Sequence, residues 1–262
     1  MAGRFIENGF VRVEQAFPQE VAAQCRALLW DDVRRQVPGI DPDDAATWTE
    51  PVVRLGDHAE EPFARAANAD RLVAAIDELV GRGRWVPRRS LGTTPVRFPS
   101  DESAGDDGWH VEGSFRGDAD EFDYFRWRLN VASKDRALLM LFLFSEVGED
   151  DAPTRVRVGS HRDVASMLAA YGEDGEEMLP FSLRAAEETA DRPVELATGG
   201  PGDVYLCHPF LVHAAQRHRG TRPRFMAQPG LRPAVAFDVE GGTSPVERAI
   251  REAIAPERTQ RE

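Results

Sequence analysis

Cysteine is scarce in this chain of 262 residues, which contains only Cys25 and Cys207. Two isolated cysteines exclude a disulfide framework and a thiolate zinc site. We expect both to be buried, because a free cysteine behaves as a small hydrophobic side chain. A reducing cytoplasm suits such a sequence, so we predict a cytoplasmic protein.

Positive charge is also in short supply. Lys and Arg together number 32 against 45 Asp and Glu, which gives a formal net charge of −13. No cluster of basic residues stands apart from neighbouring acids, and an acidic surface repels phosphate backbones. We therefore predict no nucleic-acid partner, and nothing in the sequence indicates a coenzyme A ester as substrate.

Long apolar runs are missing as well. The longest, at 137–144, is far shorter than the roughly 20 residues that a membrane-spanning helix needs, and the first ten residues lack the layout of a signal peptide. No internal repeat and no glycine pattern of a nucleotide-binding loop is visible. These absences predict no membrane partner. We also expect a small-molecule substrate and a monomer or homodimer.

Helical patterns stand at both ends of the chain. Apolar residues recur at helical spacing over 18–34 and over 69–80, where Asn68 is a candidate cap and Gly81 a stop signal. Near the C-terminus the expected helix covers about 244–255, because its first turn carries the residues of a capping box, Ser244 and Glu247. Residues after Pro256 are expected to fray.

The middle of the chain has the sequence pattern of a β protein. From about residue 90 onward, short extended segments alternate with Gly, Pro and Asp, and the largely apolar segment 137–147 predicts a strand buried on both faces. Further strands are predicted at 154–158, 193–198, 203–207, 210–215 and 223–228, with a helix at about 162–171. We predict one domain over 1–262, mainly β with flanking helices, in which helices over about 18–82 precede a sandwich or barrel over about 90–232.

One segment places two metal-ligand types side by side. In Gly-Trp-His-Val-Glu, His110 and Glu112 would point to the same face of a strand, because side-chain direction repeats every two residues. Such a pair also arises by chance in a chain with 45 acids and six histidines. If His213 arrives from a facing strand, however, the three residues form a two-His, one-carboxylate triad that leaves coordination positions open on Fe(II).

Arg224 strengthens this interpretation. It follows His213 by eleven residues, and a hairpin of that length can return its guanidinium beside the metal. The planar fork of an arginine can clamp a carboxylate with two hydrogen bonds.

Several motifs taken together resemble the phytanoyl-CoA dioxygenase family over most of the chain. The opening segment 5–17, the metal motif 108–112, the stretches 150–154 and 158–162, and the spacing of His213 and Arg224 are similar to the family's pattern. The resemblance implies a double-stranded β-helix, or jelly roll, and an Fe(II)- and 2-oxoglutarate-dependent dioxygenase. Such an enzyme uses O₂, releases succinate and CO₂, and normally hydroxylates its substrate.

The same resemblance assigns roles to individual residues. His110, Glu112 and His213 would be the metal ligands and catalytic residues, and Arg224 would bind 2-oxoglutarate. Arg97, on the strand before the metal motif, would face the co-substrate or form an ordinary salt bridge.

Two positions depart from the family's pattern. Glu112 stands where the family usually has Asp, and Ala215 stands where many members have a hydroxyl residue that helps hold 2-oxoglutarate. Thr154 is a candidate replacement donor. Ala215 leaves open the alternative of a catalytically silent jelly-roll protein that binds or senses a small molecule. A hydrolytic zinc site is a further alternative, but Arg224 would have no role in it.

Overall fold

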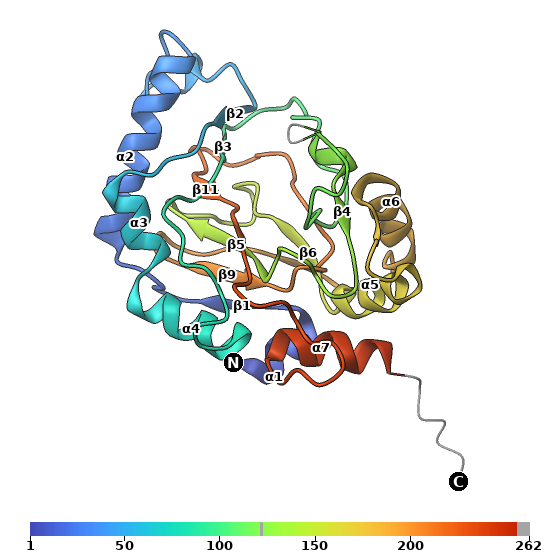
Figure 1. Cartoon of the computed structure of the whole chain (residues 1–262). Coiled ribbons are helices and arrows are strands. Elements are labelled where there is room, and N and C mark those ends of the chain that lie inside the picture. Colours follow the sequence, from blue (N-terminus) through green and yellow to red (C-terminus); the bar gives the residue numbers. More distant parts are fainter. Residues whose placement is uncertain (121–122, 256–262) are drawn as a thin grey trace.

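The computed structural model describes residues 1–120 and 123–255, and a central sheet organises them (Figure 1). Strand β9 lies between β1 and β5, and β5 also pairs with β11 and β12, all antiparallel. The strands of this sheet are β1 (Phe10–Val13), β5 (Leu138–Leu143), β9 (Val204–Cys207), β11 (Met226–Ala227) and β12 (Gly230–Leu231). The expected frayed end after Pro256 lies outside the described residues.

Three smaller sheets complete the β structure of the described residues. In the first, β6 pairs with both β8 and β10, and the other two are the pairs β2 with β3 and β4 with β7. Their bounds are β2 (Val52–Leu55), β3 (Thr94–Arg97), β4 (Arg128–Leu129), β6 (Arg155–Arg157), β7 (Glu176–Glu177), β8 (Val194–Leu196) and β10 (His213–Ala214).

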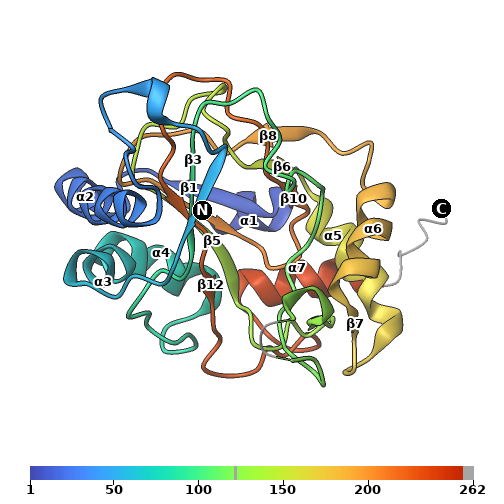
Figure 2. The same cartoon turned by 90° about the horizontal axis from the view of Figure 1, so that it is seen from above.

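Helices surround the sheets on three sides. Helices α2, α3 and α4 lie on one side, α5 and α6 on the opposite side, and α1 and α7 below the central sheet, as Figure 1 shows and the view from above in Figure 2 confirms for the two flanks. Their bounds are α1 (Ala2–Asn8), α2 (Gln19–Gln36), α3 (Glu61–Ala67), α4 (Asp70–Val80), α5 (Ser160–Leu168), α6 (Met178–Glu188) and α7 (Pro245–Ile254). Among the described residues, no helix combines the length and the hydropathy needed to span a membrane.

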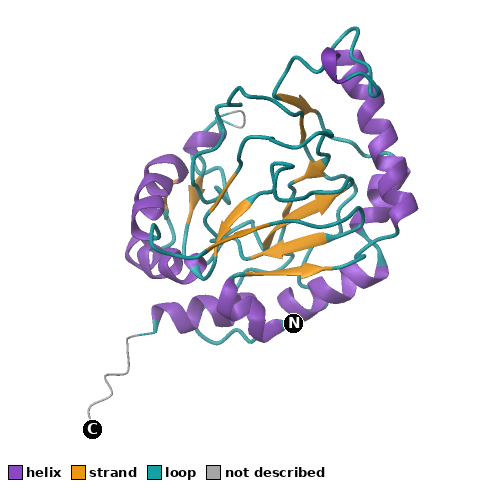
Figure 3. Ribbon diagram, turned by 180° about the vertical axis from the view of Figure 1, so that it is seen from behind, coloured by secondary structure: helices purple, strands orange, loops and turns teal. Residues whose placement is uncertain are grey.

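The elements that the strongest sequence patterns predict are present in the structure. All six residues of β5 are buried, as a strand covered on both faces requires, and Figure 3 shows this sheet from behind with helices around it. The capping box of Ser244 and Glu247 opens α7. Both cysteines are buried and unpaired, as predicted.

The boundary between helical and β regions differs from the prediction. Strands begin at residue 10, because β1 pairs with the buried strand β9, and β2 stands within the region expected to be helical. Each has only four residues, too few for an alternating pattern to be decisive. Helices α1, α3 and α6 were not predicted.

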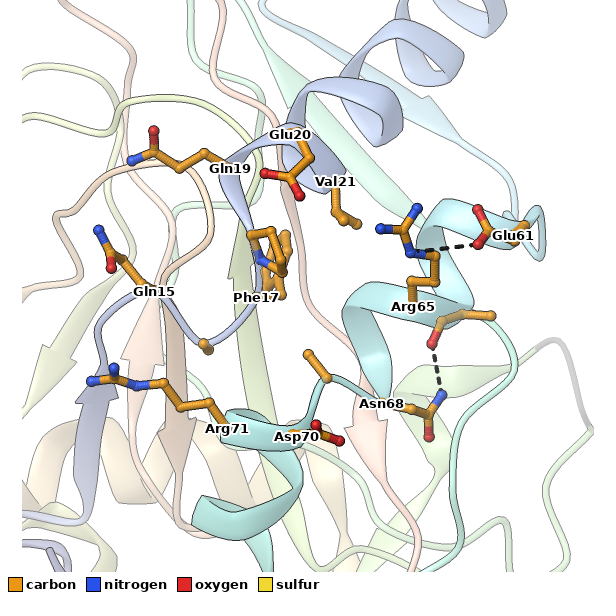
Figure 4. A pocket seen from close by; sticks show the side chains of 14 residues that line it. Gln15, Phe17, Gln19, Glu20, Val21, Glu61, Arg65, Asn68, Asp70 and Arg71 are labelled. Atoms are coloured by element: carbon orange, nitrogen blue, oxygen red, sulfur yellow. Dashed lines mark hydrogen bonds and ion pairs between the residues drawn. The ribbon is translucent and has the colours of Figure 1, made fainter.

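Asn68 does not cap the second predicted helix. The residue at the N-cap of α4 is Ala69, without a side-chain hydrogen bond. The amide of Asn68 instead donates to the carbonyl oxygen of Ala64 at 2.8 Å, in the preceding helix, and to that of Arg88 at 2.7 Å; the first of these bonds is drawn in Figure 4. Asn68 therefore ends α3 and fastens the segment around Arg88.

Candidate metal centre

Backbone pairing brings the two predicted histidine ligands together. His110 and His213 form an isolated antiparallel bridge, in which each backbone N–H donates to the other residue's carbonyl oxygen at 2.9 and 3.0 Å. Residues directly opposite each other in such a bridge place their side chains on the same face. The imidazole rings lie 4.3 Å apart between centroids. Residues more than 100 positions apart in the chain thus share one point, because β10 lies beside the metal motif.

Glu112 completes a cluster with the geometry of a metal site. Its Oε1 lies 3.4 Å from Nε2 of His213 and 3.9 Å from Nε2 of His110. One potential ligand atom from each of the three residues falls within 4.8 Å of the other two. Two imidazole nitrogens and one carboxylate oxygen form the donor set of non-haem Fe(II) sites, so the residues present fit that metal.

A hydrogen bond at Nδ1 fixes the orientation of each imidazole ring. Nδ1 of His110 lies 2.9 Å from the carbonyl oxygen of Gly108, and Nδ1 of His213 lies 3.0 Å from that of Leu211. A carbonyl oxygen can only accept, so both Nδ1 atoms carry the hydrogen and both Nε2 atoms are free to bind a cation. Burial and the nearby His213 lower the pKa of His110, which favours the neutral ring that a metal needs.

The second oxygen of Glu112 is held by residues that the sequence did not single out. The hydroxyl of Tyr124 donates to Oε2 in a short hydrogen bond, and Nη2 of Arg136 lies 3.5 Å from the same atom. Burial alone would raise the pKa of Glu112, but the charge of Arg136 and the contact with His213 lower it well below the usual value. Glu112 is therefore an anion, with Oε1 facing the histidines and Oε2 anchored.

Arg224 pairs with Arg97, a residue of the candidate cavity, and is buried. Its backbone forms a bridge with Arg97, and its fully buried side chain donates from Nη1 to the carbonyl oxygen of Ala152 at 2.6 Å. Its Nε has no hydrogen-bond partner among the described residues. Burial and the charge of Arg97 lower the pKa of Arg224 to about 9. A buried cation with an unused donor is the arrangement that an incoming carboxylate would satisfy.

A cavity of about 530 Å³ joins most of the predicted site residues. The three members of the cluster line it together with Arg97 and Thr154, whereas Arg224 does not line it. The hydroxyl of Thr154 accepts a hydrogen bond from the amide of Gln228 at 3.2 Å. Arg97 is also engaged, since its Nη2 lies 2.7 Å from Asp106. Thr154 and Gln228 thus place polar groups in the cavity that Ala215 also lines.

A larger and more open cleft of about 970 Å³ lies elsewhere, between the start of α2 and helices α3 and α4 (Figure 4). Among its charged side chains, Arg65 pairs with Glu61 at the surface. None of the six predicted site residues lines it. A binding site combines a cavity with a few convergent polar groups, so the smaller cavity, which the metal cluster lines, is the candidate site.

Residues 5–226 match the phytanoyl-CoA dioxygenase (PhyH) family, so this chain belongs to that family. It is therefore an oxidoreductase of the Fe(II)- and 2-oxoglutarate-dependent type that uses O₂, as the sequence predicted. No curated protein matches the chain.

Solved structures of such oxygenases share the fold at low sequence identity. HygX from Streptomyces hygroscopicus, with nickel and 2-oxoglutarate bound, has a TM-score of 0.54 and 18% identity, covering 88% of this chain and 85% of that one. EctD from S. alaskensis, with 2-oxoglutarate and 5-hydroxyectoine, has a TM-score of 0.55 and 20% identity, with 89% and 75% covered. The epimerase SnoN from nogalamycin biosynthesis has a TM-score of 0.55 and 17% identity, with 90% and 82% covered. The predicted jelly-roll fold is confirmed.

Proposed function

We propose that this protein hydroxylates a small organic substrate and converts 2-oxoglutarate to succinate and CO₂, with His110, Glu112 and His213 as the iron ligands. The observation that carries the proposal is the convergence of the three ligand atoms within 4.8 Å at the wall of one cavity. When bound, Fe(II) with 2-oxoglutarate and O₂ supplies the oxidising power for a C–H bond.

The chain's own residues contribute geometry to this centre. The carbonyl oxygens of Gly108 and Leu211 fix the histidine rings, while Tyr124 and Arg136 hold the carboxylate of Glu112. Partners of this kind orient ligands and reduce the reorganisation needed when a metal binds. The ligands are thus set before the metal arrives.

The 2-oxoglutarate site is proposed to lie on the Arg224 side of the cavity. Arg224 would bind the distal carboxylate of the co-substrate, exchanging its contact with the carbonyl oxygen of Ala152 for a charge-assisted pair. Arg97 and Thr154, which line the same cavity, would add donors where Ala215 offers none.

The size of the cavity supports a small substrate. About 530 Å³ falls in the range of small-molecule sites, which runs from about 300 to 1,000 Å³. Several neighbours in the comparison are described with small molecules bound, as in the complex of HygX with hygromycin B. We therefore infer a small-molecule partner for this chain too.

The test is succinate formation by variants of Glu112. Glu112→Asp should keep part of the activity, because a shorter carboxylate can still bind iron, whereas Glu112→Ala should remove most of it by removing the anionic ligand. Succinate is measured after addition of Fe(II), 2-oxoglutarate and O₂, with and without candidate substrates. Glu149→Ala, at an exposed acid outside the cavity, is the matched control. Wild-type activity in Glu112→Ala would refute the ligand assignment.

A further inference from the structure

The candidate cavity is rich in arginine although the protein as a whole is acidic. Four arginines line it, namely Arg54, Arg88, Arg97 and Arg136, against two carboxylates, Asp106 and Glu112. The chain carries a net charge of −13, so an excess of two cations around one cavity is the reverse of the overall trend. Charges in a cavity usually reflect what binds there, because burying an uncompensated charge is costly.

The two carboxylates are already shared among three of the arginines. Asp106 lies 2.7 Å from both Arg54 and Arg97, and Glu112 is in contact with Arg136. Among the residues that the structure describes, Arg88 forms no ion pair. It donates from Nε to the carbonyl oxygen of Ser90 at 2.8 Å and from Nη1 to that of Gly230. The carboxylate of Asp57 acts on Arg88 through its charge, but no carboxylate among the described residues contacts the guanidinium.

Gly230 brings the unpaired Arg88 close to Arg136. Its carbonyl oxygen accepts from Arg88, and a Cβ added at this glycine would overlap Nη1 of Arg136. Arg136 also has a buried Nε without a hydrogen-bond partner in the described part of the chain. The charge of Arg136 lowers the pKa of Arg88, so the two like charges repel each other, and an anion in contact with both would relieve this repulsion.

The Arg88 segment is built to hold this position. The carbonyl oxygen of Arg88 itself accepts the hydrogen bond from Asn68, at the end of α3, and the N–H of Val86 donates to the carbonyl oxygen of Arg232 at 3.0 Å. The backbone of the Arg88 segment is thus hydrogen-bonded to two other parts of the chain. The position of the side chain at the cavity is therefore fixed before any ligand binds.

The co-substrate does not remove the excess of positive charge. A divalent metal ion and the dicarboxylate 2-oxoglutarate cancel each other's charge, and Arg224 is the residue proposed to clamp the co-substrate. We propose, on the basis of the function proposed above, that the substrate carries an oxyanion group, a carboxylate or a phosphate, which Arg88 and Arg136 bind. The planar forks of two arginines suit either group.

Matched pairs of small probes test this inference. Protein loaded with one equivalent each of Ni(II), which does not turn over, and 2-oxoglutarate is titrated calorimetrically with acetate and acetamide, butyrate and butyramide, phenylacetate and phenylacetamide, and inorganic phosphate. At least one carboxylate should bind about ten-fold or more tightly than its own amide, or phosphate should bind about ten-fold or more tightly than all of the amides. A ten-fold preference is about what one hydrogen bond to a charged group contributes. Arg88→Gln should abolish this preference while leaving 2-oxoglutarate affinity unchanged, and Arg88→Lys should keep part of it.

Arg89→Gln, at an exposed neighbour outside the cavity lining, is the control and should keep the full preference. Equal binding of anions and amides to the wild type would overturn the proposal, as would a preference that survives in Arg88→Gln. If Arg88→Gln also lowered the affinity for 2-oxoglutarate, Arg88 and Arg136 would be assigned to the co-substrate, which would likewise overturn the proposal. The same titrations without metal and 2-oxoglutarate keep the two proposals separate: if the wild type fails to bind Ni(II), the iron centre is refuted, while an Arg88-dependent anion preference still supports this inference.

Discussion

At the scale of single residues, Glu112 divides its two oxygens between two tasks. Oε1 faces the histidines, and Oε2 is held by Tyr124 and Arg136. The extra methylene of Glu relative to Asp lengthens the reach of the carboxylate, and here the added reach is matched by a tyrosine and an arginine that receive it. The departure from the usual family residue thus comes with its own support.

Tyr124→Phe tests this support directly. The substitution keeps the ring but leaves Oε2 of Glu112 with Arg136 as its remaining holder, so Fe(II) affinity should fall about 10- to 100-fold, the usual effect of losing a partner of a metal ligand. Affinity is measured by anaerobic titration calorimetry. Tyr171→Phe, whose hydroxyl contacts Arg184 away from the cavity, should bind Fe(II) as the wild type does. Unchanged affinity in Tyr124→Phe would mean that Arg136 alone suffices.

Arg224→Lys tests the proposed clamp. Lysine keeps the positive charge but loses the planar fork, so 2-oxoglutarate binding should weaken by about 1.5–3 kcal/mol. Titration of the Ni(II)-loaded protein with 2-oxoglutarate gives the number, and a melting curve of the variant checks that it is folded. An unchanged affinity in a folded variant would place the clamp at one of the arginines that line the cavity.

At the scale of elements, patterns that span many residues were predictable and short pairings were not. The apolar run around β5 and the capping box of α7 carry their own local signal, and both formed as expected. The bridge between His110 and His213 has no such signal, because it joins single residues from distant segments. The sequence indicated which side chains could bind a metal; only the fold shows that they meet.

The capping box of α7 also makes a prediction about pH. Glu247 is fully buried, accepts hydrogen bonds from Ser244 and pairs with Arg84 at 2.6 Å. Burial would raise its pKa, but these hydrogen bonds lower the pKa to about 2, from 4.5 in an unfolded chain. Because the folded pKa is the lower one, the stabilisation is complete above about pH 4.5 and is lost as the pH falls towards 2.

Glu247→Gln should therefore reduce the free energy of unfolding by about 2 kcal/mol at pH 7, and the difference from the wild type should shrink between pH 4.5 and 2. Urea unfolding at several pH values measures this difference. Glu252→Gln, which removes an exposed pair with Arg248 on the same helix, should cost no more than about 0.5 kcal/mol. A difference for Glu247→Gln that is independent of pH would show that its charge does not matter.

At the scale of the whole molecule, the sequence was enough to predict the family but not which residues line the cavity. Charge composition predicted an acidic protein without a basic patch, yet Arg54, Arg88, Arg97 and Arg136 come together in one cavity. These residues are spread over more than 80 positions, so no window of the sequence could reveal them. Tyr124 and Gln228 escaped notice for the same reason, since their roles depend on side-chain contacts across segments.

We propose one centre, formed by His110, Glu112 and His213, that binds Fe(II) together with 2-oxoglutarate. The most direct measurement is the visible spectrum of the protein without oxygen, as Fe(II) and then 2-oxoglutarate are added, since their joint binding gives a weak metal-to-ligand charge-transfer band. We expect the band to appear in the wild type, to saturate at one Fe(II) per chain, and to be absent from folded His213→Ala. A wild-type protein that binds both components without the band, or a His213→Ala variant that keeps the band at full strength, would contradict this proposal.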